Sequence, residues 1–181
     1  MSGRVFVALF SGINVGGNRI VKMAELRGLL EQLGFGEVST YVQSGNAVLR
    51  ADEQDSAKVA GTLEKAFEAR WKFHSRIMVR DLAWLKRAVA GNPYPEIASD
   101  PTKLHLFALE REPSKDELAR LSERDTFGDE WRVKADVLYL HAPNGLGKSK
   151  FVQALPHALK IPMTARNWRT VLALLEMAGR A

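Results

Sequence analysis

Three short segments rich in glycine, asparagine and serine carry the residue types best suited to hold a ligand. They are Gly-Ile-Asn-Val-Gly-Gly-Asn at 12–18, Gln-Ser-Gly-Asn at 43–46 and Asn-Gly-Leu-Gly-Lys-Ser-Lys at 144–150. Glycine lets the backbone approach a ligand closely, and backbone N–H groups and side-chain amides donate hydrogen bonds. Amides neither gain nor lose protons readily at neutral pH, so these segments indicate binding rather than proton transfer.

The segment 144–150 resembles a phosphate-binding loop, because it lies between an expected strand and an expected helix and contains Gly-Lys-Ser. The complete pattern requires glycine six residues before Lys148, where this chain has Ala142. The expected architecture also lacks the parallel sheet of nucleotide-hydrolysing proteins, so that activity is the least favoured interpretation. Two interpretations stay open: weaker anion binding at the start of the helix, and a turn with two solvated lysines.

The segment 12–18 also has two interpretations. Its glycines could serve only to permit positive φ in a tight connection. Alternatively, the segment and its neighbour at 43–46 form a polar cradle for a ligand. The candidate ligand-binding residues in this half of the chain are Asn14, Gly16, Gly17, Asn18, Gln43, Ser44 and Asn46.

A second group of candidates lies in the C-terminal half, and consists of Lys148, Arg166, Asn167 and Arg169. We expect the last three to begin the final helix, after Thr164. Each of the two arginines could donate a bidentate pair of hydrogen bonds to a phosphate or carboxylate. They could equally be solvated or pair with the acidic residues of 101–131. Trp168 between them is expected to pack in the core rather than stack on a base.

No residue stands out as a catalyst or as a metal ligand. The four histidines are dispersed, none forms an i, i+4 pair, and the chain has no cysteine. No catalytic pair of carboxylates stands out, and no Gly-x-Ser-x-Gly pattern is present. We therefore expect no metal site and no cofactor, and a catalytic residue cannot be named.

The N-terminal half has the element order of a ferredoxin-like unit, β-α-β-β-α-β. The apolar patterns predict strands at 4–10, 38–44, 47–50 and 74–80, and helices at 22–33 and 52–71. Gly45-Asn46 is typical of a type II′ turn between the second and third strands. In this topology the first and second strands run parallel with the third between them. We therefore expect Asn14, Gln43 and Asn46 to converge at one end of the sheet.

The C-terminal half repeats part of this order. A helix that Asp81 caps ends at Gly91, and Asn92-Pro93-Tyr94-Pro95 then breaks the chain. The patterns predict strands at 103–109, 131–133 and 137–141, and helices at 114–122, from about 147, and after Thr164. Pro156 is expected to end or kink the helix that begins near 147. Ser114 and Glu117 form a capping box.

The fold class is therefore α+β: a ferredoxin-like module at 1–91, a linker at 92–102, and a second small α+β module at 103–181 that ends in helices. We further expect Lys148 or Arg166 to face the same site as Asn14, because ligand sites favour module interfaces.

Four co-linear motifs resemble those of the uncharacterised bacterial domain-of-unknown-function family 1697. They occupy residues 11–17, 41–46, 138–150 and 164–171, and residues 22–27 add to the match. The resemblance covers nearly the whole chain and implies an α+β fold of two small modules, without any assigned activity. This chain has Ser11 where the resemblance implies arginine. If that arginine holds an anion in the family, we expect this chain to bind the anion less tightly.

Charge is distributed unevenly along the chain, whose net charge is +5. Residues 132–181 contain eight basic and two acidic residues (8 − 2 = +6), whereas residues 101–131 contain five basic and eight acidic residues (5 − 8 = −3). A basic surface attracts anions, including nucleic acid. The composition and the absence of cysteine are typical of a globular protein of a reducing compartment.

The N-terminus lacks the apolar region of a signal peptide, and no apolar stretch approaches the length of a membrane span. We expect a cytoplasmic protein without a membrane partner. Binding of a small anionic, phosphate-bearing ligand is the leading hypothesis. A nucleic-acid-binding module is the alternative, and an enzyme of unidentified reaction is the third. The sequence does not indicate the oligomeric state.

Overall fold

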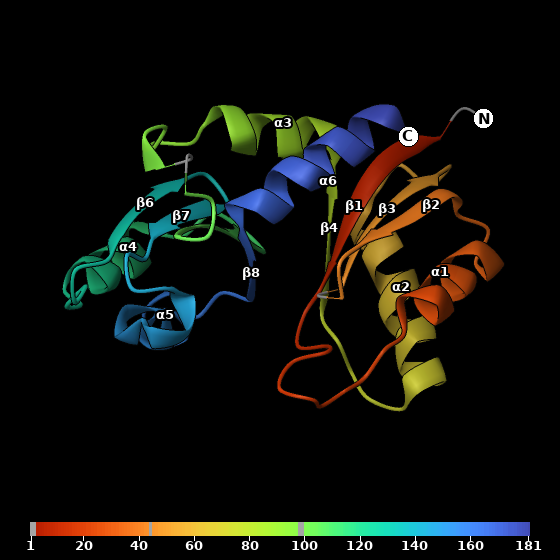
Figure 1. The fold of residues 1–181 in the computed structure, drawn as a ribbon, viewed down its shortest axis with the longest axis horizontal. Coiled ribbons are helices and arrows are strands. Elements are labelled where there is room, and N and C mark those ends of the chain that lie inside the picture. Colours follow the sequence, from red (N-terminus) through yellow and green to blue (C-terminus); the bar gives the residue numbers. More distant parts are fainter. Residues whose placement is uncertain (1–2, 44, 98–99) are drawn as a thin grey trace. The chain divides into compact units, whose positions relative to one another are not determined.

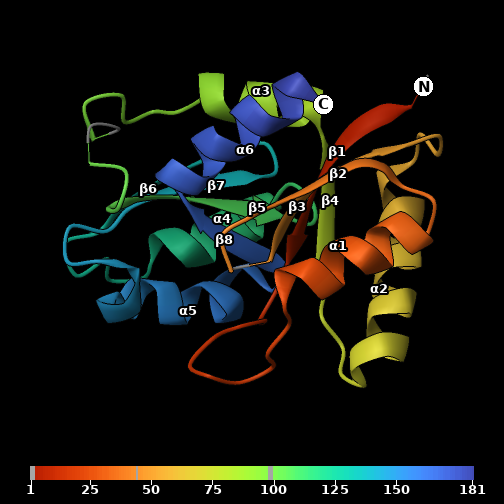
Figure 2. The same cartoon turned by 45° about the vertical axis from the view of Figure 1, so that its right-hand side comes forward.

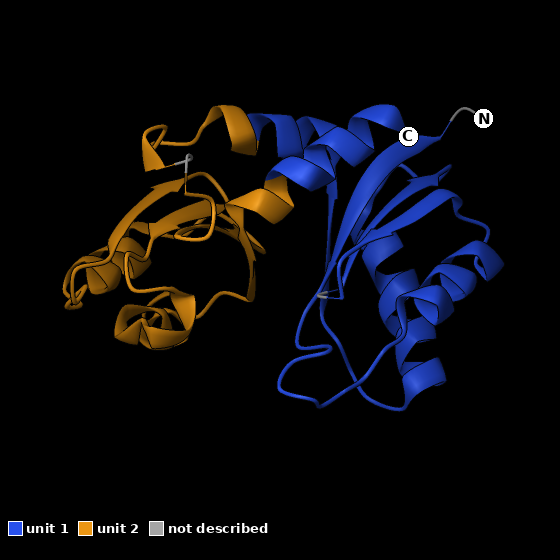
Figure 3. Cartoon of the chain, viewed as in Figure 1, with its two compact units in different colours: residues 1–87, 172–181 blue, residues 88–171 orange. Residues whose placement is uncertain are grey.

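The computed structural model describes residues 3–43, 45–97 and 100–181. The chain divides into two compact units, and Figure 3 colours each of them. Unit 1 contains residues 1–87 and 172–181, and unit 2 contains residues 88–171.

Unit 1 has the predicted ferredoxin-like order of elements (Figure 1). These are β1 (Arg4–Phe10), α1 (Met23–Gln32), β2 (Gly36–Tyr41), β3 (Asn46–Ala51), α2 (Ser56–Trp71) and β4 (Ile77–Asp81). The sheet is antiparallel between neighbours, with the order β2-β3-β1-β4. The third strand therefore lies between the first and second, as predicted, and α1 and α2 lie side by side on one face (Figure 2).

The core of unit 1 forms between that face and the two helices. Phe6, Ala8 and Phe10 of β1 belong to it, together with buried helix residues such as Leu30 and Phe67. Alternate residues of a strand point to opposite faces. The intervening residues of β1 are buried as well, so both faces of this central strand are covered.

Unit 2 has the same topology as unit 1. Its elements are β5 (Leu104–Leu109), α4 (Lys115–Ser122), β6 (Glu130–Lys134), β7 (Val137–His141), α5 (Lys150–Leu159) and β8 (Met163–Asn167). The strand order is β6-β7-β5-β8, and a short 3₁₀ helix (Leu146–Lys148) precedes α5. The predicted repeat of the element order is confirmed, and β8 completes it.

The strand β8 was missed, and the prediction that the last helix starts after Thr164 was wrong by a few residues. That helix, α6, spans Trp168–Arg180. The segment Met-Thr-Ala-Arg-Asn has little apolar character, and its strand conformation comes from pairing with β5, for example Phe107 with Ala165. Pairing with a distant strand leaves no local pattern in the sequence.

The expected boundaries at 91, 102 and 103 do not coincide with the limits of the compact units. The helix α3 (Leu82–Ala90) contains the change from unit 1 to unit 2, and residues 172–181 of α6 belong to unit 1. The segment expected as a linker begins within unit 2. There Tyr94 is buried, and its N–H donates to the side chain of Asn92.

Several local predictions differ from the structure. The helix α2 begins at Ser56 rather than 52, with Asp55 as its N-cap. Asn46 is not in the turn, because it pairs with Tyr41 as the first residue of β3; the connection is 42–45. Of the two effects predicted for Pro156, an end or a kink of the helix, the end does not occur, because α5 continues to Leu159.

Among residues 3–43, 45–97 and 100–181, none of the helices combines the length and the apolar character needed to cross a bilayer.

Candidate functional site

Three connections of unit 1 meet at one end of its sheet, which we call the loop end. They are the connections 11–22, 42–45 and 72–76. Backbone hydrogen bonds link them: the N–H of Phe10 donates to Gly45 O at 2.8 Å, and the N–H of Ser11 donates to Arg76 O at 2.9 Å. Segments that are distant in sequence thus share one surface.

The glycine-rich segment folds into a small hairpin. Asn14 N–H donates to Arg19 O at 3.2 Å, and Asn18 N–H donates to Val15 O at 3.0 Å. Gly16 and Gly17 lie between them with φ of 58° and 77°. A two-residue turn with positive φ at both positions is a type I′ turn, which favours glycine. The glycines therefore have a structural role, and the tip of the hairpin is exposed.

Asn14 joins this hairpin to the neighbouring connection. Its Nδ2 donates to Val21 O at 2.9 Å and to Gln43 O at 2.7 Å, while its Oδ1 accepts from Val21 N at 2.8 Å. The predicted proximity of Asn14 and Gln43 is therefore present in unit 1. The amide of Asn14 is engaged with the backbone, however, so this side chain shapes the loop end.

The other candidates in this half differ in exposure. The side chains of Asn18 and Gln43 are exposed. Asn46 is fully buried, and its Nδ2 donates to Tyr41 O at 3.1 Å. Ser44 lies outside the described residues. Of the predicted amides, Asn18 and Gln43 are therefore accessible from solvent, whereas Asn46 supports the hairpin between β2 and β3.

The first turn of α1 opens onto the loop end without a side-chain cap. Lys22 is its N-cap residue, with φ −73° and ψ 130°, and its side chain makes no cap hydrogen bond to the first amides of the helix. In each of the other α-helices a side chain accepts from a first-turn amide: Asp55 in α2, Asp81 in α3, Ser114 in α4, Ser149 in α5 and Asn167 in α6. The helix that follows the glycine-rich segment is thus the exception.

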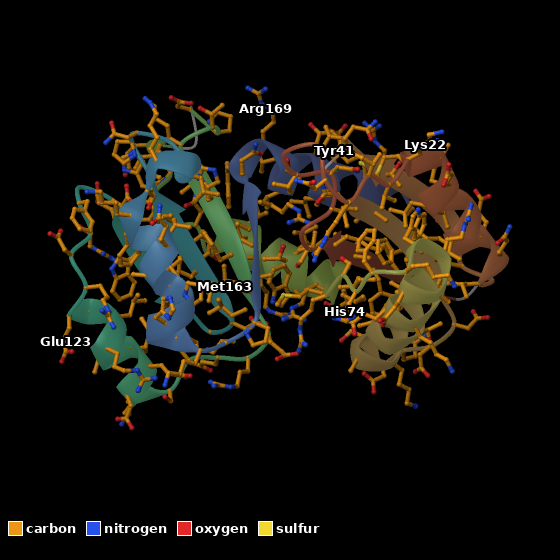
Figure 4. All side chains as sticks on the ribbon, turned by 90° about the horizontal axis from the view of Figure 1, so that it is seen from below. Lys22, Tyr41, His74, Glu123, Met163 and Arg169 are labelled. Carbon is orange, nitrogen blue, oxygen red and sulfur yellow. The ribbon has the colours of Figure 1, made fainter. Side chains whose placement is uncertain are left out.

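The loop end is also basic. Residues 11–25 and 68–76 contain five lysines and arginines and two glutamates (5 − 2 = +3). The guanidinium of Arg19 lies over the ring of Phe73, 5.4 Å from its centre, and the exposed Lys22 extends from the start of α1 (Figure 4). Neither cation was among the site residues predicted from the sequence. Lys22 could have been recognised from the sequence, because it lies at the start of the predicted helix, where the N-cap position usually holds Ser, Thr, Asp or Asn.

In unit 2 the segment 144–150 has a different character. Lys148 is exposed on the 3₁₀ helix, and Ser149 caps α5 by accepting from Val152 N at 2.9 Å. The hydroxyl of Ser149 donates to the carboxylate of Asp129 at 2.5 Å, and both residues are buried. The start of α5 therefore already has a negative charge of the protein beside it, which opposes an added anion.

The candidates Arg166, Asn167 and Arg169 do not share one helix, as had been predicted. Arg166 lies on β8, where its Nη1 donates to Thr164 Oγ1 at 2.8 Å and to Ala165 O at 2.7 Å. Burial lowers the pKa of Arg166 to about 10. Asn167 caps α6 through Thr170 N at 2.9 Å. Of these three candidates, Arg169 is the one that is exposed, and it lies on α6 (Figure 4).

Comparison with known proteins gives a family and a fold. The profile of a family described as a protein of unknown function, DUF1697, matches residues 4–139. No curated protein sequence matches the chain. A solved structure, that of the conserved bacterial protein SP0830 from Streptococcus pneumoniae, is similar with a TM-score of 0.72 and 22% sequence identity. The similarity covers 97% of this chain and 98% of that one, and at this identity it concerns the fold alone.

Proposed function

We propose that this chain, which belongs to the DUF1697 family of proteins of unknown function, binds a small phosphate-bearing anion at the loop end of unit 1. The observation that carries the proposal is the uncapped start of α1 directly after the glycine-rich hairpin. The first amides of a helix have no acceptor within the helix and carry a partial positive charge. A glycine-rich loop followed by a helix start is a frequent phosphate-binding arrangement.

Charge and rigidity support the same location. The net charge of +3 around the hairpin attracts anions, and Lys22 and Arg19 supply charged donors. The hydrogen bonds of Asn14 hold the connections in place before a ligand arrives, which reduces the ordering cost of binding. In this proposal Asn18 and Gln43 supply exposed amides, whereas Asn14, Gly16, Gly17 and Asn46 shape the site.

The test is a thermal-shift titration of the full chain with inorganic phosphate, pyrophosphate and ATP, because a ligand of the folded state raises the unfolding temperature. Lys22→Asp would place a carboxylate at the start of α1, and should abolish the shift. Lys86→Asp, which changes an exposed lysine of α3, is the charge-matched control and should keep it. The proposal fails if the wild type shows no shift at concentrations on the order of 10 mM. It fails equally if both variants lose the shift to the same extent.

The alternative of a nucleic-acid-binding module receives no support from a particular observation. Ferredoxin-like modules that bind single strands stack bases on exposed aromatic residues of the sheet. Here the central strands β1 and β5 are buried on both faces. The candidates Lys148, Arg166 and Arg169 of unit 2 stay predictions, and the proposed site does not require them.

A further inference from the structure

We propose a second ligand site in unit 1: a groove between the end of α1 and the start of α2 that binds a small molecule with an apolar, aromatic body and one carboxylate or sulfonate group. The site is independent of the proposed function. The two lie at opposite ends of the sheet, because Leu9 pairs with Asn46 at the loop end whereas Arg4 pairs with Ala51 beside the groove.

The groove is large enough for such a molecule. Its volume is about 680 Å³, within the range that small-molecule sites usually occupy. Residues 33–35, directly after α1, form one wall. The end of β3 and the residues after it form a second wall, and one side of α2 forms the third. All the residues that line it belong to unit 1.

The floor of the groove is apolar and firmly packed. Ala51 and Val59 are members of the core of unit 1, and Leu33 and Phe35 pack against that core. Since these side chains are held by the core, the floor is formed before a ligand binds. An aromatic body placed on it would remove apolar surface from water, which is the main source of affinity for small ligands.

Gly61 keeps the side of α2 open. Glycine inside a helix destabilises it by about 1 kcal/mol relative to alanine. At Gly61 no close approach explains the absence of a side chain, since a Cβ there would have no atom within 4 Å. Gly61 lines the groove. Any larger side chain at this position would therefore occupy space that a ligand can use.

The charged residues at the rim include one lysine that is available to an acidic group of a ligand. Lys58 is paired with Glu53 at 3.5 Å, and the N–H of Asp55 donates to that carboxylate, which lowers its pKa and keeps it charged. Lys65 is exposed and has no ion pair among the residues that the structure describes. Asp52 lies at the same rim and disfavours a doubly charged anion such as phosphate. The groove and the loop end thus select different ligands.

The test is a fluorescence titration of the full chain with 8-anilinonaphthalene-1-sulfonate, an aromatic molecule with one sulfonate. Gly61→Leu should weaken binding by about tenfold or more, because its side chain occupies the groove. Gly28→Leu is the matched control, since Gly28 is also a helix glycine with open space at its Cβ but does not line the groove. Lys65→Gln should weaken binding by about fivefold, and Lys65→Arg should restore it.

Circular dichroism of each variant would establish that it folds before it is titrated. Binding that Gly61→Leu leaves unchanged would overturn the proposal, as would an equal loss in Gly28→Leu or no binding by the wild type. Lys22→Asp should leave this titration unchanged, so failure of the anion site at the loop end and failure of the groove are distinguished.

Discussion

The two units have the same order of elements and the same strand order, but they differ at the first connection between strand and helix. In unit 1 this connection is residues 11–22, and in unit 2 it is residues 110–114. The longer connection forms a glycine hairpin and leads to a helix without a side-chain cap. The shorter one leads to a helix whose first amides are satisfied by the protein itself.

The start of α4 has the side-chain caps that the start of α1 lacks. Ser114 Oγ accepts from Glu117 N at 3.2 Å, and Glu117 Oε2 accepts from Ser114 N at 2.8 Å. Both terminal nitrogens of Arg111 donate to the carboxylate of Glu117 at 2.8 Å. A carboxylate thus lies at the start of this helix, with its own cation. The same topology therefore places a helix start after the first strand of each unit. The side chains around that start decide whether its first amides are free to bind a ligand.

The largest expected effect concerns the second connection at the loop end. In Gly45→Ala the new Cβ would lie 2.7 Å from Ile13 Cδ1 and 2.8 Å from Phe10 Cβ, at a φ of 72°. We expect a loss of about 3 kcal/mol in the free energy of unfolding, measured with urea. Gly16→Ala, at φ 58° with open space around it, is the control and should lose about 1 kcal/mol. Equal losses would mean that steric contact does not distinguish the two positions.

Asn14→Ala should have the next largest effect. It removes three hydrogen bonds that hold the connections of the loop end together, and leaves backbone groups of Val21 and Gln43 without their partner. We expect a loss of about 2 kcal/mol in urea unfolding, together with weaker anion binding. Asn18→Ala removes one long hydrogen bond of 3.4 Å at an exposed position, and should change stability by less than about 0.5 kcal/mol. A neutral Asn14→Ala would refute the role of this side chain in shaping the site.

The carboxylate of Glu117 at the start of α4 should make the stability of the protein depend on pH. The hydrogen bonds from Arg111, followed by that from Ser114, lower the pKa of Glu117 to about 2. The folded state therefore binds this proton less readily than the unfolded state, so the stabilisation is present above about pH 4.5 and is lost as the pH falls toward 2. We expect this stabilisation to contribute about 1–2 kcal/mol to the free energy of unfolding, since the partly exposed Arg111 is screened by solvent.

The measurement is the free energy of unfolding of the wild type and of Glu117→Gln between pH 2 and 6. The variant should show a shallower slope within that window. If the two slopes agree, the carboxylate of Glu117 does not carry the difference between the two helix starts.

The smallest expected effects come from two substitutions, one that adds a side-chain cap to α1 and one that removes the cap of α4. Lys22→Ser would supply a cap to α1 at a residue whose backbone is already extended, and should stabilise the protein by about 0.5–1 kcal/mol. Ser114→Ala should destabilise it by about 1 kcal/mol. Both changes are measured by urea unfolding. A Lys22→Ser variant without added stability would indicate that the first amides of α1 already have partners, which would also contradict the proposed anion site.

Patterns that depend on neighbours in the chain were predictable from the sequence. The apolar runs of β1 and β5, the capping box of Ser114 and Glu117, and the order of elements in unit 1 agree with the structure. These features depend on side-chain periodicity and on contacts within a few residues. The order of elements then limits the topology, because crossover connections are right-handed. It also accounts for the predicted proximity of Asn14 and Gln43.

Features that depend on partners distant in sequence were decided only by the tertiary structure. The strand β8 exists because it pairs with β5. The pairing of Tyr41 with Asn46 places Asn46 in a strand rather than in a turn. Asn14 bonds to Gln43 across 29 positions, and Ser149 bonds to Asp129 across 20. The sequence indicated that these polar side chains would need hydrogen-bond partners. The folded backbone determines which donor meets which acceptor, and therefore which of the candidate loops remains open to a ligand.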